Sequence, residues 1–288
     1  MSGDPAGFLL LEHVNVNVAD YGAARRFYEA LGCEQAVVPI HMNCGPHTQF
    51  HLPQETPAQI WRGTVTIAYT PEGLAGTRMR LDEFCASVCE AVEIRAVCGA
   101  LAVTGPWGTF TCREASEMEA AMAKLPTRRP NTDATTRLGV VGIVAVSLPL
   151  ASGTAADVAR FYEETFGFSA KVSEATGVRQ VVVSGGPVEN SQEIRFYELE
   201  EGAAVPSYVG DHFCIYVGDF ESCFERCQER GVLYVNPRFT WLDDSKTLEQ
   251  AQHWQAFRIL EVKSASGDST LFMEEHEIRS RRHRLKCT

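Results

Sequence analysis

An internal repeat constrains the fold of this chain more than any other feature of its sequence. Residues 26–29 have the sequence RFYE and precede Gly32, and residues 160–163 repeat the same four letters before Gly167. A strand-like segment comes before each copy. The spacing of apolar residues in each copy predicts an amphipathic helix that its glycine ends. The repeat therefore indicates a duplicated structural unit and a chain built of related halves.

Two predicted strands, residues 12–18 and 211–217, each carry one polar face. Side chains alternate between the two faces of a strand, so residues two apart share a face. Valines fill the other face of the first strand, and Phe, Ile and Val fill that of the second. The polar faces consist of His13, Asn15 and Asn17 in the first strand and of His212, Cys214 and Tyr216 in the second.

The rest of the chain predicts strands and helices separated by turns rich in Gly, Pro and Asn. Residues 39–46 are expected to form a loop, residues 126–137 a polar linker, and residues 242–255 an insertion or a lid over the site. Predicted strands are residues 34–38, 48–52, 59–61, 64–69, 100–103, 109–112, 140–146, 180–183, 193–199, 257–262 and 270–275. Predicted helices are residues 23–31, 81–92, 157–167 and 220–230.

Composition excludes several classes of protein. The chain has 288 residues, 45% of them hydrophobic, which is enough for a sizeable core. A formal net charge of -11 and a pI near 5.3 argue against nucleic-acid binding, which needs a basic surface. No apolar run has the length of a membrane span, and the first residues do not resemble a secretion signal. We therefore expect a cytoplasmic monomer or homodimer with reduced cysteines and a small-molecule ligand.

Three longer segments resemble the vicinal-oxygen-chelate superfamily, which includes glyoxalases, bleomycin-resistance proteins and extradiol dioxygenases. They are EHVNVNVADYGAARRFYEALGCE (residues 12–34), VARFYEETFGF (158–168) and DHFCIYVGDFESCFERCQERGV (211–232). The shorter sequences QFHLP, PWGTF and EEHEIRSRRH resemble an uncharacterised two-domain branch of that group. The resemblance covers nearly the whole chain.

The resemblance implies an α+β fold in which four strand-helix-strand-strand-strand (βαβββ) modules form two glyoxalase-like half-barrel domains. The first domain is expected at residues 8–125, with modules at about 8–62 and 63–125. The second is expected at residues 138–280, with modules at about 138–205 and 206–280, before a basic tail at residues 281–288.

In this superfamily the metal ligands come from the first and last strands of a module. By that rule the first module offers His13 and His51. The fourth offers His212 with Glu275 or Glu274, of which Glu275 is preferred. Imidazoles and a carboxylate suit a divalent ion such as Zn, Fe(II), Mn, Ni or Co. The predicted catalytic residues are Glu275 and Tyr216, and the predicted substrate-binding residues are Asn15, Asn17, Gln49, Cys214 and His253.

These ligands are divided between the first and the fourth module, and the second and third modules offer no convincing set. If the first module pairs with the fourth, His13, His51 and His212 meet a C-terminal glutamate in one site. The resemblance thus implies a metal-dependent enzyme, a lyase, isomerase or dioxygenase, that acts on a small oxygenated molecule. The alternative is a metal-free binding protein of the bleomycin-resistance type.

Other residues have simpler interpretations. His41 and His276 fall in a predicted loop and in the predicted C-terminal tail, and both are expected at the surface. Glu277 is a further carboxylate, but it lies past the predicted end of the last strand. The Phe and Tyr of the repeat are expected to pack between helix and sheet.

Overall fold

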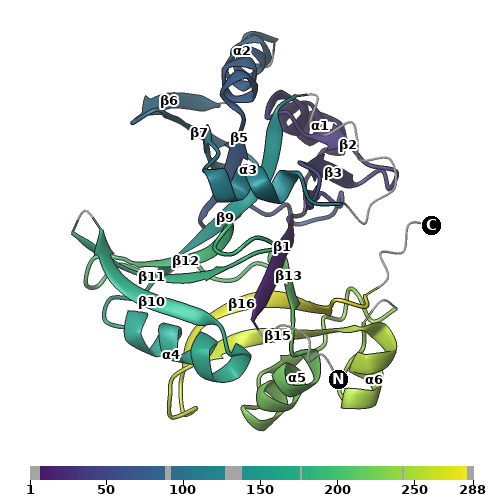
Figure 1. The fold of residues 1–288 in the computed structure, drawn as a ribbon, viewed down its shortest axis with the longest axis vertical. Coiled ribbons are helices and arrows are strands. Elements are labelled where there is room, and N and C mark those ends of the chain that lie inside the picture. The colour runs from purple at the N-terminus through teal and green to yellow at the C-terminus, as the bar shows by residue number, and fades with distance from the viewer. Residues whose placement is uncertain (1–6, 88–91, 127–137, 176, 242, 284–288) are drawn as a thin grey trace. The chain divides into compact units, whose positions relative to one another are not determined.

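The computed structural model describes residues 7–87, 92–126, 138–175, 177–241 and 243–283 (Figure 1). In these residues the fold is α+β, as predicted. The order strand-helix-strand-strand-strand occurs three times, and a fourth time with a helix, α6, inserted after the second strand. The chain divides into two compact units. The N-terminal unit is Glu12–Ser147, and the C-terminal unit contains residues 7–11 and 148–283.

The N-terminal unit contains the first two modules. The first consists of β1 (Phe8–Asn15), which enters this unit at residue 12, α1 (Tyr21–Ala30), β2 (Glu34–Gln35), β3 (His41–Cys44) and β4 (Thr48–His51). The second consists of β5 (Thr64–Tyr69), α2 (Pro71–Ser87), β6 (Glu93–Val97), β7 (Ala100–Gly105) and β8 (Gly108–Glu114). After it come α3 (Glu117–Ala123) and β9 (Val140–Leu150), which leaves this unit after residue 147. Adjacent strands follow the orders β1-β4-β3-β2 and β9-β5-β8-β7-β6.

The C-terminal unit contains the last two modules. Beyond the end of β9, the third consists of α4 (Ala155–Phe166), β10 (Ser169–Ala175), β11 (Val178–Gly185) and β12 (Gln192–Glu198). The fourth consists of β13 (His212–Val217), α5 (Phe220–Glu229), β14 (Leu233–Tyr234), α6 (Leu248–Trp254), β15 (Ala256–Lys263) and β16 (Thr270–Ser280). Adjacent strands follow the orders β13-β16-β15-β14 and β12-β11-β10. Helix α5 packs against both α4 and α6. In Figure 1, α4 lies below β10, and α5 lies below β15.

The aromatic residues of the repeat pack between helix and sheet, as predicted. In the N-terminal unit the Tyr28 ring from α1 lies 4.7 Å from the Phe50 ring of β4, measured between centroids. In the C-terminal unit the Tyr162 ring from α4 lies 5.3 Å from the Phe196 ring of β12. All four side chains are fully buried. Each repeat copy therefore attaches its helix to the sheet behind it.

Several elements differ from the sequence prediction. β3 occupies the predicted loop at residues 39–46, because its residues are buried or half-buried on both faces and show no alternation. β6 and β10 are exposed edge strands, and α3 is short, so none of them carries a strong apolar pattern. The predicted strand at residues 59–61 is absent. There the Gln59 side chain, instead of a strand ladder, accepts a hydrogen bond from the Asn17 backbone N–H (2.8 Å).

Helix α2 begins at Pro71, ten residues before its predicted start. Proline fits the first turn of a helix because the N–H that it lacks has no partner there. Gly73, in the first turn of α2, lowers the helix propensity of this segment. A larger residue would not fit, because a Cβ at this position would lie 2.5 Å from the Gly139 carbonyl oxygen. The glycine is thus kept for close packing, which sequence patterns do not reveal.

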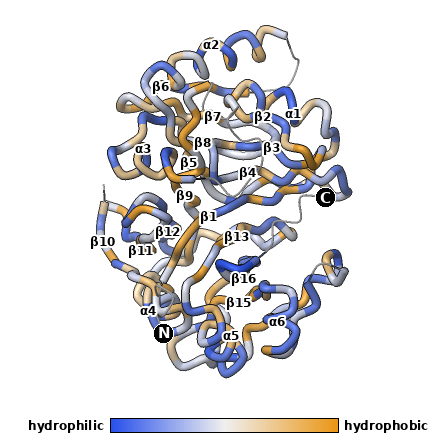
Figure 2. The backbone as a smooth tube through the Cα atoms, turned by 45° about the vertical axis from the view of Figure 1, so that its right-hand side comes forward, coloured by the Kyte–Doolittle hydropathy of each residue, from blue (hydrophilic) through white to orange (hydrophobic). Residues whose placement is uncertain are grey.

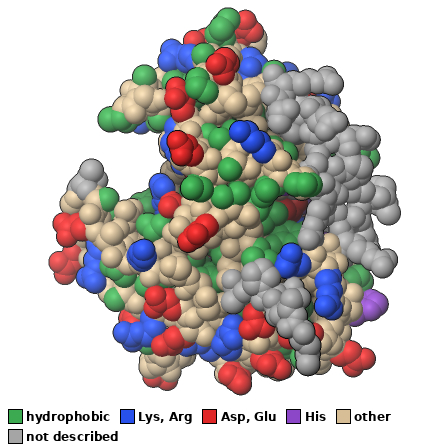
Figure 3. All heavy atoms as spheres, viewed as in Figure 1, with side chains coloured by type: hydrophobic (Ala, Val, Ile, Leu, Met, Phe, Trp, Pro, Cys, Tyr) green, Lys and Arg blue, Asp and Glu red, His purple; other side chains and the backbone are tan. Residues whose placement is uncertain are grey.

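Other predictions lie largely outside the described residues. Most of the predicted linker at residues 126–137 and of the predicted basic tail at residues 281–288 lies outside the described residues. The predicted domain boundaries therefore stay predictions. No described helix combines the length and the apolar character that a membrane span requires. On the face drawn in Figure 3, acidic and basic side chains are interspersed.

His276, predicted at the surface, is buried inside β16. That strand includes a hydrophilic stretch (Figure 2), yet the His276 ring lies 4.5 Å from the Phe213 ring in the core of the C-terminal unit. Its Nδ1–H donates to the Glu274 carbonyl (2.8 Å), and its Nε2 lies 2.5 Å from the Tyr162 hydroxyl, from which it accepts. Burial lowers the pKa of His276 to about 4.

The close approach of Gly45 to β9 gives a first prediction. Gly45 has a φ of +77°, and a Cβ there would collide with the Val141 carbonyl oxygen. Gly99 has a similar φ of +80° but has no atom within 4 Å of such a Cβ. Gly99→Ala should therefore cost only backbone strain, about 1–2 kcal/mol, whereas Gly45→Ala should cost about 1–3 kcal/mol more. Urea unfolding measures both, and equal losses would contradict the packing assignment.

The buried His276 predicts a specific loss of stability in acid. Its pKa is about 4 in the folded state, whereas an unfolded histidine has a pKa of about 6.5. Stability is therefore fully present above pH 6.5, and falls by about 1.4 kcal/mol per pH unit as the pH drops towards 4. His276→Gln still accepts from Tyr162 and does not titrate. The difference in unfolding free energy between this variant and the wild type should follow that slope, and a difference independent of pH would refute it.

Candidate functional site

The first module forms a polar surface across three adjacent strands of the N-terminal unit. β1 and β4 are parallel, and β4 and β3 are antiparallel, and their registers place polar residues opposite one another in rows. We call these six residues the histidine face. One row consists of His13, Gln49 and Asn43, and the next consists of Asn15, His51 and His41.

The imidazole rings of the histidine face are stacked. The His51 ring lies 3.7 Å from the His13 ring, at an interplanar angle of 19°. On its other side it lies 3.7 Å from the His41 ring, at 3°. His13 and His51 are buried, with 1% and 8% of their surface exposed, and His41 is half-buried. The prediction that His41 is an ordinary surface residue of a loop is therefore wrong.

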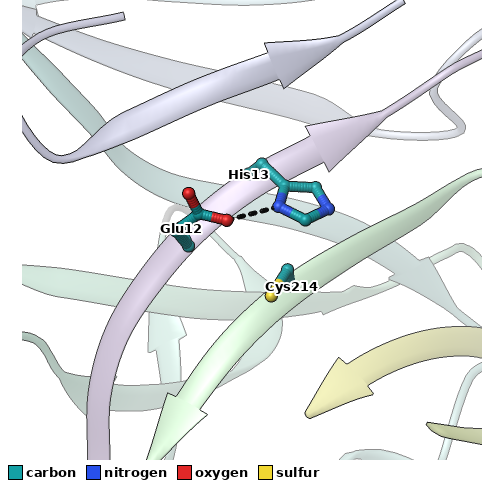
Figure 4. Close-up of side chains that lie close together, drawn as sticks. All are labelled: Glu12, His13 and Cys214. Carbon is teal, nitrogen blue, oxygen red and sulfur yellow. Dashed lines mark hydrogen bonds and ion pairs between the residues drawn. The ribbon is translucent and has the colours of Figure 1, made fainter. Parts of the chain in front are cut away.

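Hydrogen bonds hold the two buried imidazoles in defined orientations. His13 Nδ1 lies 2.5 Å from Glu12 Oε2 (Figure 4). His51 Nε2 lies 3.1 Å from Gln49 Oε1, and the Gln49 amide nitrogen donates to Asn43 Oδ1 (2.6 Å). Each histidine thus has one ring nitrogen held by a neighbouring side chain.

Asn15 supplies a buried acceptor beside these rings. Only 5% of its surface is exposed, and among the described residues its Oδ1 has no hydrogen-bond partner. An unsatisfied buried carbonyl costs about 1–3 kcal/mol. A ligand hydroxyl next to His51 would recover that energy. Asn17 is also buried, and its backbone pairs with Gln59 as described above.

The fourth module carries a different polar surface in the C-terminal unit. Its strand registers place His212 opposite Glu275, Cys214 opposite Glu277, and Glu277 opposite Arg258. Glu277 belongs to this surface because β16 continues to Ser280 instead of ending near residue 275. We call the buried charged residues here the charged cluster. It consists of His212, Asp243, Arg258, Glu275 and Glu277, each at most 5% exposed.

Two carboxylates flank His212. Its Nε2 lies 3.6 Å from Glu277 Oε2, and its Nδ1 lies 4.0 Å from Glu275 Oε1. Arg258 joins the same two carboxylates, donating to Glu275 at 2.7 Å and to Glu277 at 2.8 Å. The Nε of Arg258 also lies 3.3 Å from Asp243. The cluster is therefore one connected network around His212.

Several side chains donate hydrogen bonds to Glu275. The Tyr208 hydroxyl donates to its Oε2 (2.5 Å), and the Asn236 amide donates to the same oxygen (2.8 Å). Burial raises the pKa of Glu275, but His212, Arg258 and these donors outweigh it and hold that pKa below its ordinary value. Glu275 is thus an ionised carboxylate in a fixed orientation.

The positive and negative charges of the cluster nearly cancel, and its net charge is negative. Burial alone would lower the pKa of Arg258, but its neighbouring carboxylates raise it, so the guanidinium stays charged. Arg279 adds a second guanidinium, 2.5 Å from Glu277. Burial lowers the pKa of His212, which favours the neutral ring. Three carboxylates against two guanidiniums leave one net negative charge, which suits a cation.

Three predicted site residues lie away from His212. Side chains alternate along β16, so Glu274 shares the face of His276 and points away from Glu275. Tyr216 lies two rows beyond His212, opposite Arg279. His253 is exposed on α6.

The predicted lid at residues 242–255 contains α6, which packs against α5 and β15. The segment just before α6 is the part that reaches the charged cluster. Phe239 places its ring 5.6 Å from the His212 ring and 4.9 Å from the Arg258 guanidinium. Asp243 and Asn236 contact the cluster as described above.

Sequence reasoning missed several residues of these surfaces. Glu12 was assigned no role, because alternation places it on the face opposite His13. Arg258 had a usable signal, since it is the only charged residue in the first five positions of β15, AFRIL. Tyr208, Asn236 and Asp243 come from irregular segments, where no periodicity exists to mark them.

The two modules place polar residues at equivalent positions. His13 and His212 both stand on the first strand, opposite Gln49 and Glu275 on the last strand. One row further, His51 of the first module is equivalent to Glu277 of the fourth. His51 lies opposite His41 on the neighbouring strand, and Glu277 lies opposite Arg258. Each unit therefore carries one imidazole-containing surface of the same design.

Comparison with known proteins supports the fold. No family model matches the sequence, and a search of curated proteins gives no match. Glyoxalase I from Zea mays has a TM-score of 0.57 and 11% identity, over 96% of this chain and 93% of that chain. A putative dioxygenase from Bacillus subtilis subsp. subtilis str. 168 has a TM-score of 0.55 and 14% identity, over 96% of this chain and 86% of that chain. The predicted resemblance is confirmed for the fold.

The charged cluster predicts an asymmetric response to mutation. Arg258→Leu leaves three buried carboxylates without their central cation and should destabilise the protein by about 3–5 kcal/mol. Arg195→Leu removes an arginine from a half-buried, solvent-accessible pair with Glu193 on β12 and should cost no more than about 1 kcal/mol. Urea unfolding of both variants checks this, and a similar small loss in both would contradict the network described for Arg258.

Proposed function

We propose that this chain, which has the fold of the vicinal-oxygen-chelate superfamily, is a metal-dependent enzyme acting on a small oxygenated molecule. One observation carries the proposal. The first and the fourth module each place a histidine on the first strand and a second possible metal ligand one row further, on the last strand. That second ligand is His51 in the first module and Glu277 in the fourth. Buried imidazole and carboxylate groups at repeated positions are the ligands that Zn, Fe(II), Mn, Ni and Co bind.

The spacing of donor atoms in the charged cluster fits a metal ion. Nitrogen and oxygen ligands bind such ions at about 2.0–2.2 Å, so two ligands of one ion are at most about 4 Å apart. His212 Nε2 and Glu277 Oε2 are 3.6 Å apart. The net negative charge of the cluster favours a cation there as well. His212 and Glu277 are therefore the proposed ligands of the fourth module, and His13 and His51 those of the first.

Glu275 is assigned a catalytic role instead of a ligand role. Its oxygens already accept hydrogen bonds from Tyr208, Asn236 and Arg258. It is ionised, fixed and adjacent to His212, as a group that accepts a proton from a bound substrate must be. Asn15 on the histidine face would orient the substrate by accepting a hydrogen bond from its hydroxyl.

A bound divalent ion would polarise adjacent substrate oxygens and stabilise the negative charge that develops on them. Lyase, isomerase and dioxygenase reactions of small oxygenated molecules all use such stabilisation. The residues of the chain supply binding, orientation and the proton acceptor. The catalytic role predicted for Tyr216 stays a prediction. Its ring lies 6.3 Å from the His283 ring.

A second candidate function has one observation in its favour. Arg258 bonds both glutamates of the charged cluster and neutralises most of its charge without a metal. This arrangement also suits a metal-free binding protein that uses the same surfaces to hold a ligand.

Metal content distinguishes the two functions. Protein purified without a His-tag should hold a stoichiometric transition metal, measured by mass spectrometry, and chelation should lower its thermal stability. His253→Ala, at an exposed histidine, should leave the metal content unchanged. Absence of metal, with stability unaffected by chelator, would reject the enzyme and favour the binding protein.

The same measurement tests how the modules pair. The expectation that one ion takes ligands from the first and the fourth module stays a prediction. If it holds, His13→Ala and His212→Ala should each abolish the same single metal. Loss of two independent metals would instead show that each unit binds its own ion.

A further inference from the structure

We propose that Glu12 and Gln49 are positioning residues that fix opposite tautomers of His13 and His51. His13 then carries its proton on Nδ1 and offers Nε2, whereas His51 carries its proton on Nε2 and offers Nδ1. The inference rests on the proposed function in taking these nitrogens as metal ligands. The tautomers themselves exist in the metal-free protein, so they are measurable without it.

A short hydrogen bond to the Glu12 carboxylate determines the tautomer of His13. Its Oε2 lies 2.5 Å from His13 Nδ1, and only 2% of Glu12 is exposed. A carboxylate accepts hydrogen bonds and does not donate them, so Nδ1 must carry the proton. The lone pair then belongs to Nε2.

The position of Glu12 indicates a specific purpose. Alternation along β1 directs residue 12 to the face opposite His13. The Glu12 side chain nevertheless bends back to the His13 ring (Figure 4). Burying a carboxylate is costly unless it is hydrogen-bonded. The contact with His13 meets that requirement and orients the ring at the same time.

Gln49 determines the tautomer of His51, and Asn43 determines the orientation of Gln49. The Gln49 amide nitrogen donates to Asn43 Oδ1 at 2.6 Å, so its Oε1 is the atom that faces His51 Nε2 at 3.1 Å. An amide oxygen only accepts, so His51 Nε2 carries the proton. The lone pair of His51 then belongs to Nδ1.

The two neighbouring rings consequently present different nitrogens. Their centroids lie 3.7 Å apart, at 19°, and His41 stacks on the far side of His51. Neither ring can turn over without losing its hydrogen bond and disturbing the stack. A ligand histidine whose other N–H is bound in this way holds metal more tightly, and loss of that bond typically weakens metal affinity 10–100-fold.

Nitrogen-15 NMR of labelled histidines in the metal-free protein tests the inference directly. In the wild type, His13 should be protonated at Nδ1 and His51 at Nε2. Glu12→Gln keeps an acceptor oxygen and should keep the His13 tautomer, whereas Glu12→Leu should lose it. Gln49→Met should release the His51 tautomer and leave that of His13 unchanged.

Calorimetric titration with Zn²⁺ provides the second readout. Glu12→Leu should weaken binding about 10–100-fold, and Glu12→Gln should restore most of the affinity. Glu119→Leu is the control for general destabilisation, because Glu119 is a buried glutamate of the same unit that instead bonds Arg113. It should leave both tautomers and the affinity unchanged.

The outcomes separate this inference from the proposed function. A wild-type His13 protonated at Nε2, or a Glu12→Leu variant with unchanged tautomer and affinity, would overturn the inference while leaving metal binding in place. A wild type with the expected tautomers that binds no Zn²⁺ would instead reject the proposed function. If Glu12→Leu does not fold, the spectra of the wild type and of Glu12→Gln decide the question.

Discussion

Strand alternation inside a buried sheet is the constraint on which the functional surfaces of this protein depend. Residues two apart share a face, and the register between strands joins those faces into rows. A polar residue placed on such a row in the core costs free energy unless its neighbours satisfy it. Each of the two buried histidines, His13 and His212, therefore requires polar partners on the same row and on the adjacent rows. A shift of one residue in either register would move every one of these side chains to the opposite face.

The two modules satisfy that constraint in different ways. The histidine face relies on amides and one neighbouring carboxylate. Gln49 and Asn43 pair with each other and with His51, and Glu12 pairs with His13. The charged cluster relies on ions, with Arg258 at its centre. Neutral amides leave imidazole lone pairs available, whereas the ionic network retains a negative charge. Each of these properties favours a bound metal ion, so the same strand pattern suits metal binding in each module with different residues.

The parts of the site that were predictable share one property: they depend on local periodicity. His13, Asn15 and His212 lie on the expected strand faces because alternation needs only neighbouring residues. Arg258 and Glu277 depend on the register between β15 and β16, which pairs residues nineteen positions apart and cannot be read from either strand alone.

Other differences arise where composition misleads. The hydrophilic run at residues 274–277 predicts the end of a strand, yet β16 continues through it because Glu275, His276 and Glu277 all have buried partners. His276 pairs with Tyr162, and Glu277 pairs with Arg258. Glu12 is a similar case, since a glutamate beside three valines is unexpected until its contact with His13 is seen. Polar residues in a core are predictable only together with their partners.

The choice between Glu275 and Glu277 follows from the same principle. A ligand must exchange its protein contacts for the metal, and each contact given up reduces the gain. Glu275 would give up Tyr208, Asn236 and Arg258, whereas the bonds described for Glu277 come from two arginines, Arg258 and Arg279. Glu277 lies nearer to His212 and is equivalent in register to His51, itself a proposed ligand. The repeat therefore assigns metal binding to Glu277 and leaves Glu275, an ionised carboxylate in a fixed orientation, in the catalytic role proposed above.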